Sequence, residues 1–297
     1  QSIVEAMVRT LIHRGPDEQK TLLVDQVAFG FSRLSIIGLD NGMQPIFNED
    51  RSVVLVCNGE IFNYIEIRED LRRRGHVFRT DSDVEVIVHL YEMYGMDFLN
   101  ELNGQFAFVL YDRNKKCLFC ARDQMGIVPL YYTVVGNAFI FGSEAKAILK
   151  HPGVRPEVDT VGLDQVFTFA GLISPRTLFK GIHSLENGHF LRVDEGGAVQ
   201  NHEYWDLIYP EGAVPMNGKP ECHYVDQLEA LFERSIRLRL RADVPSGLYL
   251  SGGLDSSMIA MKVSQLQPQL RKAAFSIDFI DSLHSESRFQ KLIARES

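Results

Sequence analysis

The segment at residues 208–220 constrains this chain most, because it separates two stretches with different hydrophobic patterns. Prolines and glycines crowd into this segment at Pro210, Gly212, Pro215, Gly218 and Pro220. Clusters of this kind are typical of linkers. We therefore predict one domain over residues 1–207, a linker over 208–220, and the beginning of a second domain over 221–297.

The first stretch is predicted to be mainly strands and turns. Val53–Cys57 is a continuous apolar run, which indicates a strand covered on both faces. Two hairpins are expected, over residues 106–122 and 130–142, the second around Gly136-Asn137. Helical spacing of apolar residues appears at 3–12, 64–74 and 84–94. The third of these helices is predicted to bury Val84, Ile87, Leu90, Tyr91 and Tyr94 on one face. The first domain is therefore predicted to be α+β.

The second stretch has a different period. An amphipathic helix is expected over residues 225–240, followed by a strand at 247–250, a glycine turn, a helix at 256–265 and a strand at 273–279. The strand–turn–helix–strand order predicts an α/β domain with a parallel sheet.

Composition excludes some classes of function. The chain has 297 residues, of which 45% are hydrophobic, so a sizeable core can form. Its net charge of −8 argues against binding to nucleic acid or to an anionic membrane, since both need a basic surface. No apolar run is long enough to span a bilayer. Four scattered cysteines predict reduced thiols in a cytoplasmic protein, and the Cys117-x-x-Cys120 pair is predicted to be ordinary packing.

The sharpest motif is Ser251-Gly252-Gly253-Leu254-Asp255-Ser256-Ser257, placed between a strand and a helix. Glycines let the backbone approach an anion, and the N–H groups at a helix start attract it. Asp255 would repel a polyphosphate unless Mg²⁺ lay between them. The alternative is an ordinary helix cap. The loop lacks the lysine of a G-x-x-x-x-G-K-[ST] motif, which disfavours kinase-like transfer.

This loop resembles the pyrophosphate loop of the ATP pyrophosphatase group, in the version found in asparagine synthetases. Further segments, at residues 13–17, 33–37, 58–64, 82–87 and 123–131, resemble the class II glutamine amidotransferase domain of the same family. The resemblance implies a first domain of stacked antiparallel sheets with helices, similar to Ntn hydrolases, followed by a partial parallel-sheet synthetase domain.

The resemblance also implies particular site residues. The predicted ATP contacts are Leu250, Ser251, Gly252, Gly253, Leu254, Asp255, Ser256, Ser257 and Ile277, with Asp255 as the Mg²⁺ ligand. Asp278 stands where the family tends to have glycine. The predicted glutamine contacts are Arg33, Leu34, Ser35, Ile36, Ile37, Asn58, Gly59, Glu60 and Asp83.

Each predicted glutamine contact has a chemical reason. Arg33 can form two hydrogen bonds with the carboxylate of glutamine, and Asp83 can take its ammonium. The Asn58 side chain and the Gly59 N–H can stabilise an oxyanion. The alternative is that Arg33 and Asp83 pair with each other or with other groups, and that Asn58-Gly59 is a plain turn.

In this family the nucleophile is an N-terminal cysteine whose α-amine acts as the base. We expect that cysteine before Gln1, and we expect the chain as it stands not to hydrolyse glutamine. Cys57 is predicted to be a core residue rather than a substitute nucleophile. The synthetase domain is expected to continue past Ser297, beyond the acidic element at His284-Ser285-Glu286-Ser287.

The resemblance implies an ATP-dependent enzyme that transfers glutamine-derived ammonia to an adenylated carboxylate and releases AMP and pyrophosphate. Its substrates would be glutamine, ATP and a small carboxylic acid, aspartate by default, and a homodimer is one option for its assembly. Two alternatives stay open. One is a biosynthetic relative that acts on another acid and forms an amide, a hydroxamate-type product or a β-lactam. The other is a degenerate glutaminase-like scaffold domain without catalysis.

Overall fold

The computed structural model describes residues 2–212, 218–269, 273–279 and 285–296. The chain divides into two compact units, Gln1–Ile208 and Tyr209–Ser297, and each unit is described by itself. Several residues used in the sequence predictions lie outside the described ones: Gln1, Pro215 in the predicted linker, His284 and Ser297.

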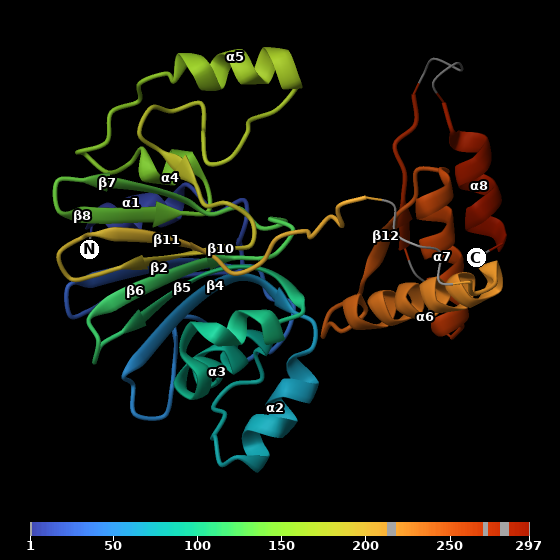
Figure 1. Ribbon diagram of the computed structural model, residues 1–297, viewed down its shortest axis with the longest axis horizontal. Coiled ribbons are helices and arrows are strands. Elements are labelled where there is room, and N and C mark those ends of the chain that lie inside the picture. Colours follow the sequence, from blue (N-terminus) through green and yellow to red (C-terminus); the bar gives the residue numbers. More distant parts are fainter. Residues whose placement is uncertain (1, 213–217, 270–272, 280–284, 297) are drawn as a thin grey trace. The chain divides into compact units, whose positions relative to one another are not determined.

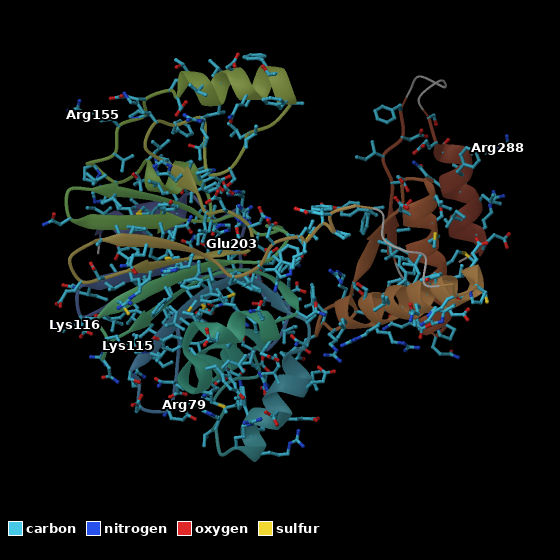
Figure 2. All side chains as sticks on the ribbon, in the orientation of Figure 1. Arg79, Lys115, Lys116, Arg155, Glu203 and Arg288 are labelled. Atoms are coloured by element: carbon cyan, nitrogen blue, oxygen red, sulfur yellow. The ribbon has the colours of Figure 1, made fainter. Side chains whose placement is uncertain are left out.

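A six-stranded antiparallel sheet forms the centre of the first unit (Figure 1). Its strands, in hydrogen-bonding order, are β11 (Val199–Glu203), β10 (His189–Val193), β6 (Cys117–Arg122), β5 (Gly104–Asp112), β4 (Val53–Ile61) and β3 (Ile46–Phe47). The longest pairing joins β4 to β5, from Val53 opposite Asp112 to Ile61 opposite Gly104. The predicted strand at Val53–Cys57 and the first predicted hairpin are confirmed. Lys115 and Lys116 extend from the polar turn of that hairpin (Figure 2).

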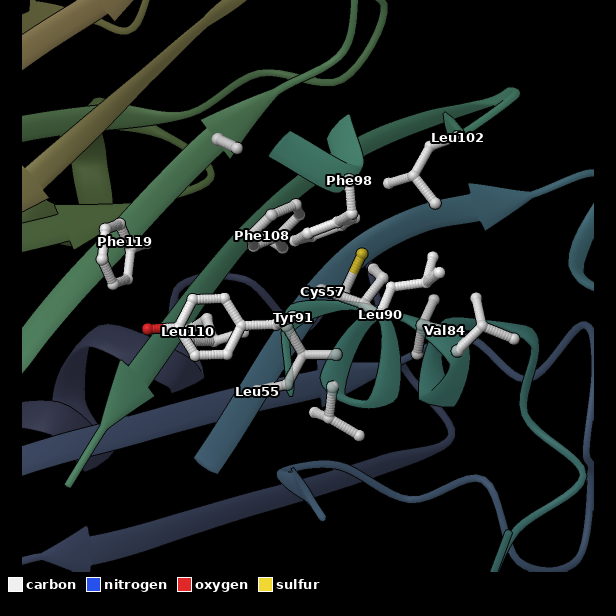
Figure 3. Close-up of a cluster of buried hydrophobic side chains, with 14 of the residues drawn as sticks. Leu55, Cys57, Val84, Leu90, Tyr91, Phe98, Leu102, Phe108, Leu110 and Phe119 are labelled. Atoms are coloured by element: carbon white, nitrogen blue, oxygen red, sulfur yellow. The ribbon is translucent and has the colours of Figure 1, made fainter. Parts of the chain in front are cut away.

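Helices cover one face of this sheet. They are α2 (Tyr64–Arg73) and α3 (Val86–Tyr94), with the short 3-10 helices η1 (Asp83–Glu85) and η2 (Gly95–Glu101) at the ends of α3. Side chains of a strand alternate between its faces. Leu55 and Cys57 of β4 accordingly point into the apolar cluster under α3, where they pack with Leu90 and Tyr91 (Figure 3).

The predicted burial of the third helix is only partly correct. Val84, Ile87, Leu90 and Tyr91 are buried, but Tyr94 is 43% exposed, because Gly95 ends the helix directly after it. The remaining positions also differ from a simple amphipathic pattern. Val86, Val88 and His89 are buried as well, since α2, η2 and the turn between β3 and β4 cover other sides of α3.

A second layer covers the opposite face of the six-stranded sheet (Figure 1). It contains the β1 (Glu18–Val24) and β2 (Val27–Arg33) hairpin, and a three-stranded sheet of β8 (Ala138–Gly142), β7 (Tyr131–Val135) and β9 (His183–Ser184). Helices α1 (Ser2–Arg9) and α4 (Ala145–Ile148) pack on this layer. The predicted stack of antiparallel sheets with helices is therefore confirmed, as is the second hairpin.

Two helical segments differ from the sequence prediction. The first helix ends at Arg9 and not near Ile12, because residues 10–14 form turns such as the bond from the Leu11 N–H to the Val8 carbonyl. Ile12 is 55% exposed as a result. The helix α5 (Thr160–Phe169) was not predicted. The Asp159 side chain caps it by accepting from the Gly162 N–H at 2.8 Å.

The second unit has the predicted order of elements. These are α6 (Glu221–Arg239), β12 (Gly247–Tyr249), α7 (Leu254–Leu266) and β13 (Ala273–Phe275). The helix α8 (Ser287–Glu296) follows these four elements. Strands β12 and β13 pair in parallel, which confirms the predicted parallel sheet. The second strand is shorter than predicted, because after Phe275 the Ser276 hydroxyl donates to the Leu250 carbonyl. Within the described residues, no helix combines the length and apolar character needed to cross a bilayer.

Gly59 in β4 offers a test of how tightly the central sheet is packed. Its φ is +132°, and an added Cβ would overlap the backbone carbonyl oxygen of Gln105 on β5. We expect Gly59→Ala to lower the free energy of unfolding by about 3–4 kcal/mol, from backbone strain and steric overlap together. Denaturant unfolding followed by the fluorescence of the single tryptophan, Trp205, measures this loss.

Gly75→Ala is the matched control, since Gly75 has a φ of +101° and no atom lies within 4 Å of its added Cβ. The free energy of unfolding of that variant should fall only by the cost of the strained backbone conformation, about 1–2 kcal/mol. Equal losses at the two positions would show that the contact with Gln105 has no energetic consequence.

Candidate functional site

A cavity of about 730 Å³ lies in the first unit, on the side of the six-stranded sheet that faces β2 and β8. The residues predicted to contact glutamine line it, with one exception: Arg33, Leu34, Ile36, Ile37, Asn58, Gly59, Glu60 and Asp83. Ser35 is the exception. The structure therefore gathers residues from three separate motifs around a single space.

Asp83 supplies a buried carboxylate to the cavity. It begins η1, is 5% exposed, and accepts a hydrogen bond from the Ile61 N–H at 2.7 Å. Burial raises the pKa of the Asp83 carboxyl to about 6, while the Ile61 N–H partly opposes this shift and the Glu60 charge adds to it. A carboxylate held this way gains much from a ligand cation, which would replace the water it has lost.

Arg33 supplies a buried guanidinium at the end of β2. Its side chain donates to two backbone carbonyls, from Nη1 to Leu39 at 3.0 Å and from Nη2 to Gly38 at 2.6 Å. Both Arg33 and Asp83 lie among the described residues, and no ion pair joins them. The alternative in which they pair with each other is therefore wrong, whereas its other half holds, because each residue already bonds to backbone groups of the protein. The cavity has a positive and a negative group on separate parts of its wall.

Asn58 supplies an amide whose donor has no partner. Asn58 lies on the same face of β4 as Val56, opposite to Cys57, and it lines the cavity. Its Nδ2 atom is buried, and no described residue hydrogen bonds to it. Buried donors are nearly always paired, so this one is available to an acceptor on a ligand. The alternative of a plain turn is wrong, because Asn58 and Gly59 lie inside β4 and pair with β5.

Gly59 is required by the packing of the sheet itself. The adjacent backbone of β5, at Gln105, excludes any side chain at this position. Whether its N–H contacts an oxyanion stays a prediction.

The segment at residues 33–37 is held by Asp17 of the first motif. The Asp17 N–H donates to the Arg33 carbonyl at 3.0 Å, and its side chain accepts from the Ser35 N–H at 2.8 Å. Ser35 thus contributes to the position of the segment rather than to the cavity wall. Ile37 is buried, whereas Leu34 is 56% exposed.

Two residues that the sequence analysis did not single out also build the site. The Gln44 side chain forms two hydrogen bonds with the backbone of Cys57, at 2.6 and 2.9 Å, directly before Asn58. Gly42 leaves room for the Arg33 guanidinium, since an added Cβ would lie 2.6 Å from Nη2. Neither belongs to a recognisable motif, because their roles depend on contacts between separate segments.

The motif at residues 123–131 has a structural role that depends on Asp123. Asp123 is 1% exposed, and its carboxylate accepts from the N–H groups of Met125, Ile127 and Val128 at 3.0–3.1 Å. It therefore shapes the loop that places Val128 in the wall of the cavity.

Three of the four cysteines of the chain, Cys57, Cys117 and Cys120, are buried. Cys57 points into the apolar cluster under α3 (Figure 3), and burial, together with the nearby Asp83 charge, raises the pKa of its thiol well above the usual range. Cys117 and Cys120 are buried with free thiols. These observations confirm that all three are packing residues.

In the second unit, the predicted phosphate loop lies between β12 and α7. The Ser251 hydroxyl contacts the Ser256 hydroxyl at 2.9 Å and accepts from the Gly253 N–H at 3.2 Å. Gly253 is the N-cap of α7, and no side chain caps this end of the helix. Asp255 lies within the first turn of α7 and is therefore not its cap, which removes the alternative role for this carboxylate.

Gln290 of α8 connects the two segments predicted to contact ATP. Its Nε2 donates to the Ser251 carbonyl at 3.2 Å and to the Ile277 carbonyl at 3.0 Å, and its side chain is buried. Ile277 is 76% exposed beside the loop, whereas the Leu250 side chain is buried. Leu250 can therefore contribute through its backbone more readily than through its side chain.

The first unit is thus a stack of antiparallel sheets with a cavity that is lined by a buried carboxylate, a buried guanidinium and an amide donor without a partner. Comparison with known families assigns this domain. Residues 1–205 match the glutamine amidotransferase domain family, and residues 227–297 match the asparagine synthase family. The chain belongs to the glutamine amidotransferase domain family, and its C-terminal residues are related to asparagine synthase.

Individual relatives support this assignment. The chain is 34% identical to asparagine synthetase (glutamine-hydrolyzing) 1 of Bacillus subtilis, over 96% of this chain and 44% of the relative. It is 38% identical to amidase chyE of Penicillium rubens, over 86% of this chain and 38% of the relative. The chain thus spans less than half of either relative. A solved structure of the allosteric regulatory enzyme of purine biosynthesis shares the fold, with a TM-score of 0.52 and 16% identity over 93% of this chain and 62% of that one.

The raised pKa of Asp83 predicts a specific dependence of stability on pH. The folded chain keeps the Asp83 proton up to a pH of about 6, whereas the unfolded chain releases it near pH 4. Stability therefore falls as the pH rises from about 4 to 6, and ionised Asp83 costs about 3 kcal/mol at pH 7.5. Asp83→Asn removes this cost while its Oδ1 can still accept from Ile61.

Denaturant unfolding of both proteins at pH 4.5 and 7.5, followed by Trp205 fluorescence, tests this expectation. The variant should be about 1 kcal/mol more stable than the wild type at pH 4.5, where the unfolded chain has already released most of the Asp83 proton, and about 3 kcal/mol more stable at pH 7.5. A variant that is less stable at both pH values would mean that the ionised carboxylate stabilises the fold.

Proposed function

We propose that the cavity of the first unit binds free glutamine and positions its side-chain amide for ammonia release. The observation that carries this proposal is the arrangement of Arg33, Asn58 and Asp83 around one space. Glutamine has an α-carboxylate, an α-ammonium and a side-chain amide, and these three groups of the protein complement them in charge and in hydrogen bonding.

Each of the three residues has one role in this proposal. Arg33 receives the α-carboxylate beside the carbonyls that already orient its guanidinium. Ionised Asp83 receives the α-ammonium. The unpartnered Nδ2 of Asn58 donates to the amide oxygen, and this bond strengthens as negative charge develops on that oxygen.

For the whole protein we propose ATP-dependent amide formation. ATP would bind at Ser251–Ser257 with Mg²⁺ held by Asp255, and the carboxylate of the acceptor would attack the α-phosphate. Pyrophosphate leaves, ammonia then replaces AMP on the acyl-adenylate, and an amide forms. The relatives described as glutamine-hydrolyzing asparagine synthetases support aspartate as the acceptor. The homodimer and the cytoplasmic location stay predictions from the sequence.

Glutamine binding should depend on the ionisation of Asp83. Because the ammonium of glutamine needs the carboxylate form, its affinity should rise from pH 5 to pH 7 and level off above the Asp83 pKa of about 6. Asp83→Asn should lose about 2–3 kcal/mol of binding free energy at pH 7.5, and its remaining affinity should not vary over this pH range. Titration calorimetry of the chain with glutamine measures both effects.

Asp81→Asn is the matched control, because it makes the same chemical change two residues away, at an exposed side chain that does not line the cavity. It should bind glutamine as the wild type does, with the same pH profile. If Asp83→Asn bound glutamine normally at pH 7.5, the proposed ammonium contact would be wrong.

A further inference from the structure

A second cluster of chemically active side chains lies on the α3 side of the central sheet, away from the cavity. It consists of Glu49, in the turn between β3 and β4, His76, in the segment after α2, and His89 and Glu92 on α3. One ligand atom of each residue can be chosen so that all four lie within 4.8 Å of one another. The proposed glutamine site uses none of these residues.

The N···O distances in this cluster are longer than those of strong charged hydrogen bonds. His89 Nδ1 lies 3.3 Å from Glu49 Oε2 and 3.3 Å from Glu92 Oε2. His76 Nδ1 lies 3.4 Å from Glu49 Oε1 and 3.6 Å from Glu92 Oε2. Charged N–H···O bonds are usually about 2.7–2.9 Å long. Ligands about 2.0–2.2 Å from a tetrahedral Zn²⁺ ion are about 3.3–3.6 Å apart. The four N···O distances lie in this range, with Glu49 facing His89 through Oε2 and His76 through Oε1, and one ligand atom from each residue lies within 4.8 Å of the others.

The charge of the cluster also calls for a cation. Glu85, whose side chain is 1% exposed, adds a third carboxylate 3.7 Å from Nε2 of His89. The His89 side chain is itself fully buried. Three carboxylates around two imidazoles leave a net negative charge even when both imidazoles are protonated, so a divalent cation among them is favourable.

The surrounding hydrogen bonds orient the potential ligands. Glu92 Oε1 accepts from the Asn48 side chain at 2.8 Å, and Glu49 Oε1 accepts from the Val77 N–H at 2.9 Å. Arg79, labelled in Figure 2, donates from Nη2 to the Glu49 carbonyl at 2.7 Å. Hydrogen bonds of this kind hold carboxylate ligands in position around protein metal ions.

The two nitrogens of His89 have different surroundings. Nδ1 faces Glu49 and Glu92, whereas Nε2 is buried without a hydrogen-bond partner among the described residues and faces Glu85. A histidine that binds a metal through Nδ1 carries its proton on Nε2, and such a proton is commonly directed at a carboxylate. Glu85 is in the right place to receive it.

We propose that Glu49, His76, His89 and Glu92 form a tetrahedral site for a divalent transition-metal ion of the Zn²⁺ type. Two imidazole nitrogens and two carboxylate oxygens are a donor set that suits Zn²⁺, whereas Mg²⁺ prefers oxygen ligands alone. The ion joins the β3–β4 turn, the segment after α2 and α3. Its role is to stabilise this side of the domain, independently of glutamine binding.

The test uses the whole chain after removal of metal with a chelator. The exposed Cys222 and its neighbour His223 are competing ligands, so the measurements are made in a Cys222→Ser background. We expect one Zn²⁺ per chain by equilibrium dialysis with elemental analysis. Zn²⁺ should raise the melting temperature of the first unit by about 5 °C, and Mg²⁺ should not. Co²⁺ should give the strong visible absorption of a tetrahedral site.

Two variants remove single ligands with little change in shape. Glu92→Gln replaces the carboxylate with an amide whose oxygen can still accept from the Asn48 side chain. His76→Gln changes a side chain that is 17% exposed. Each should lose the bound Zn²⁺, the Co²⁺ spectrum and the Zn²⁺-dependent rise in melting temperature. His202→Gln replaces an exposed histidine outside the cluster and should retain all three.

Circular dichroism in the absence of metal shows whether each variant is folded. If either variant fails this check, the other decides the question. The proposal is overturned if the Cys222→Ser chain binds no Zn²⁺. It is also overturned if a folded Glu92→Gln or His76→Gln variant keeps the full stoichiometry and the Co²⁺ spectrum.

Discussion

The pairing of β4 with β5 is the constraint on which the rest of the first unit depends. It continues along the whole of both strands, from Val53 opposite Asp112 to Ile61 opposite Gly104. Because side chains alternate along a strand, β4 serves two layers at once. Leu55 and Cys57 close the apolar core under α3, and Val56 and Asn58 face the cavity. A shift of one residue in this register would exchange the core and site residues.

The site buries two charged side chains, Arg33 and Asp83, and such burial costs free energy. Arg33 satisfies two carbonyls of the segment that follows β2, and Asp83 takes an N–H at the end of β4, so each charge is attached to a different element. Neither neutralises the other. Burying both charges lowers the stability of the domain below what its packing alone would allow, and a ligand with both opposite charges, as proposed for glutamine, would offset that loss.

Much of the fold could be predicted from local patterns, and part of the site could be predicted from its motifs. Strands such as β4 are evident from continuous apolar runs, and the parallel pair of the second unit follows from the order of its elements. The positions of Gln44 and Gln290 could not be predicted, because their side chains hydrogen bond to backbone far away in the sequence. The steric reason for a glycine at position 59 could not be predicted either, because it depends on the backbone of the neighbouring strand and not on the segment that contains Gly59.

The segment between α2 and α3 links the cavity to the proposed metal cluster of the first unit. Its Glu85 carboxylate accepts from the N–H groups of Arg79 and Thr80, both at 2.8 Å, and so folds the residues before η1 back onto the helix start. Asp83, two residues earlier, is thereby held against Ile61. The same carboxylate faces His89 in the proposed metal cluster. Glu85 therefore has a structural role toward both sites, and its almost complete burial follows from serving both at once.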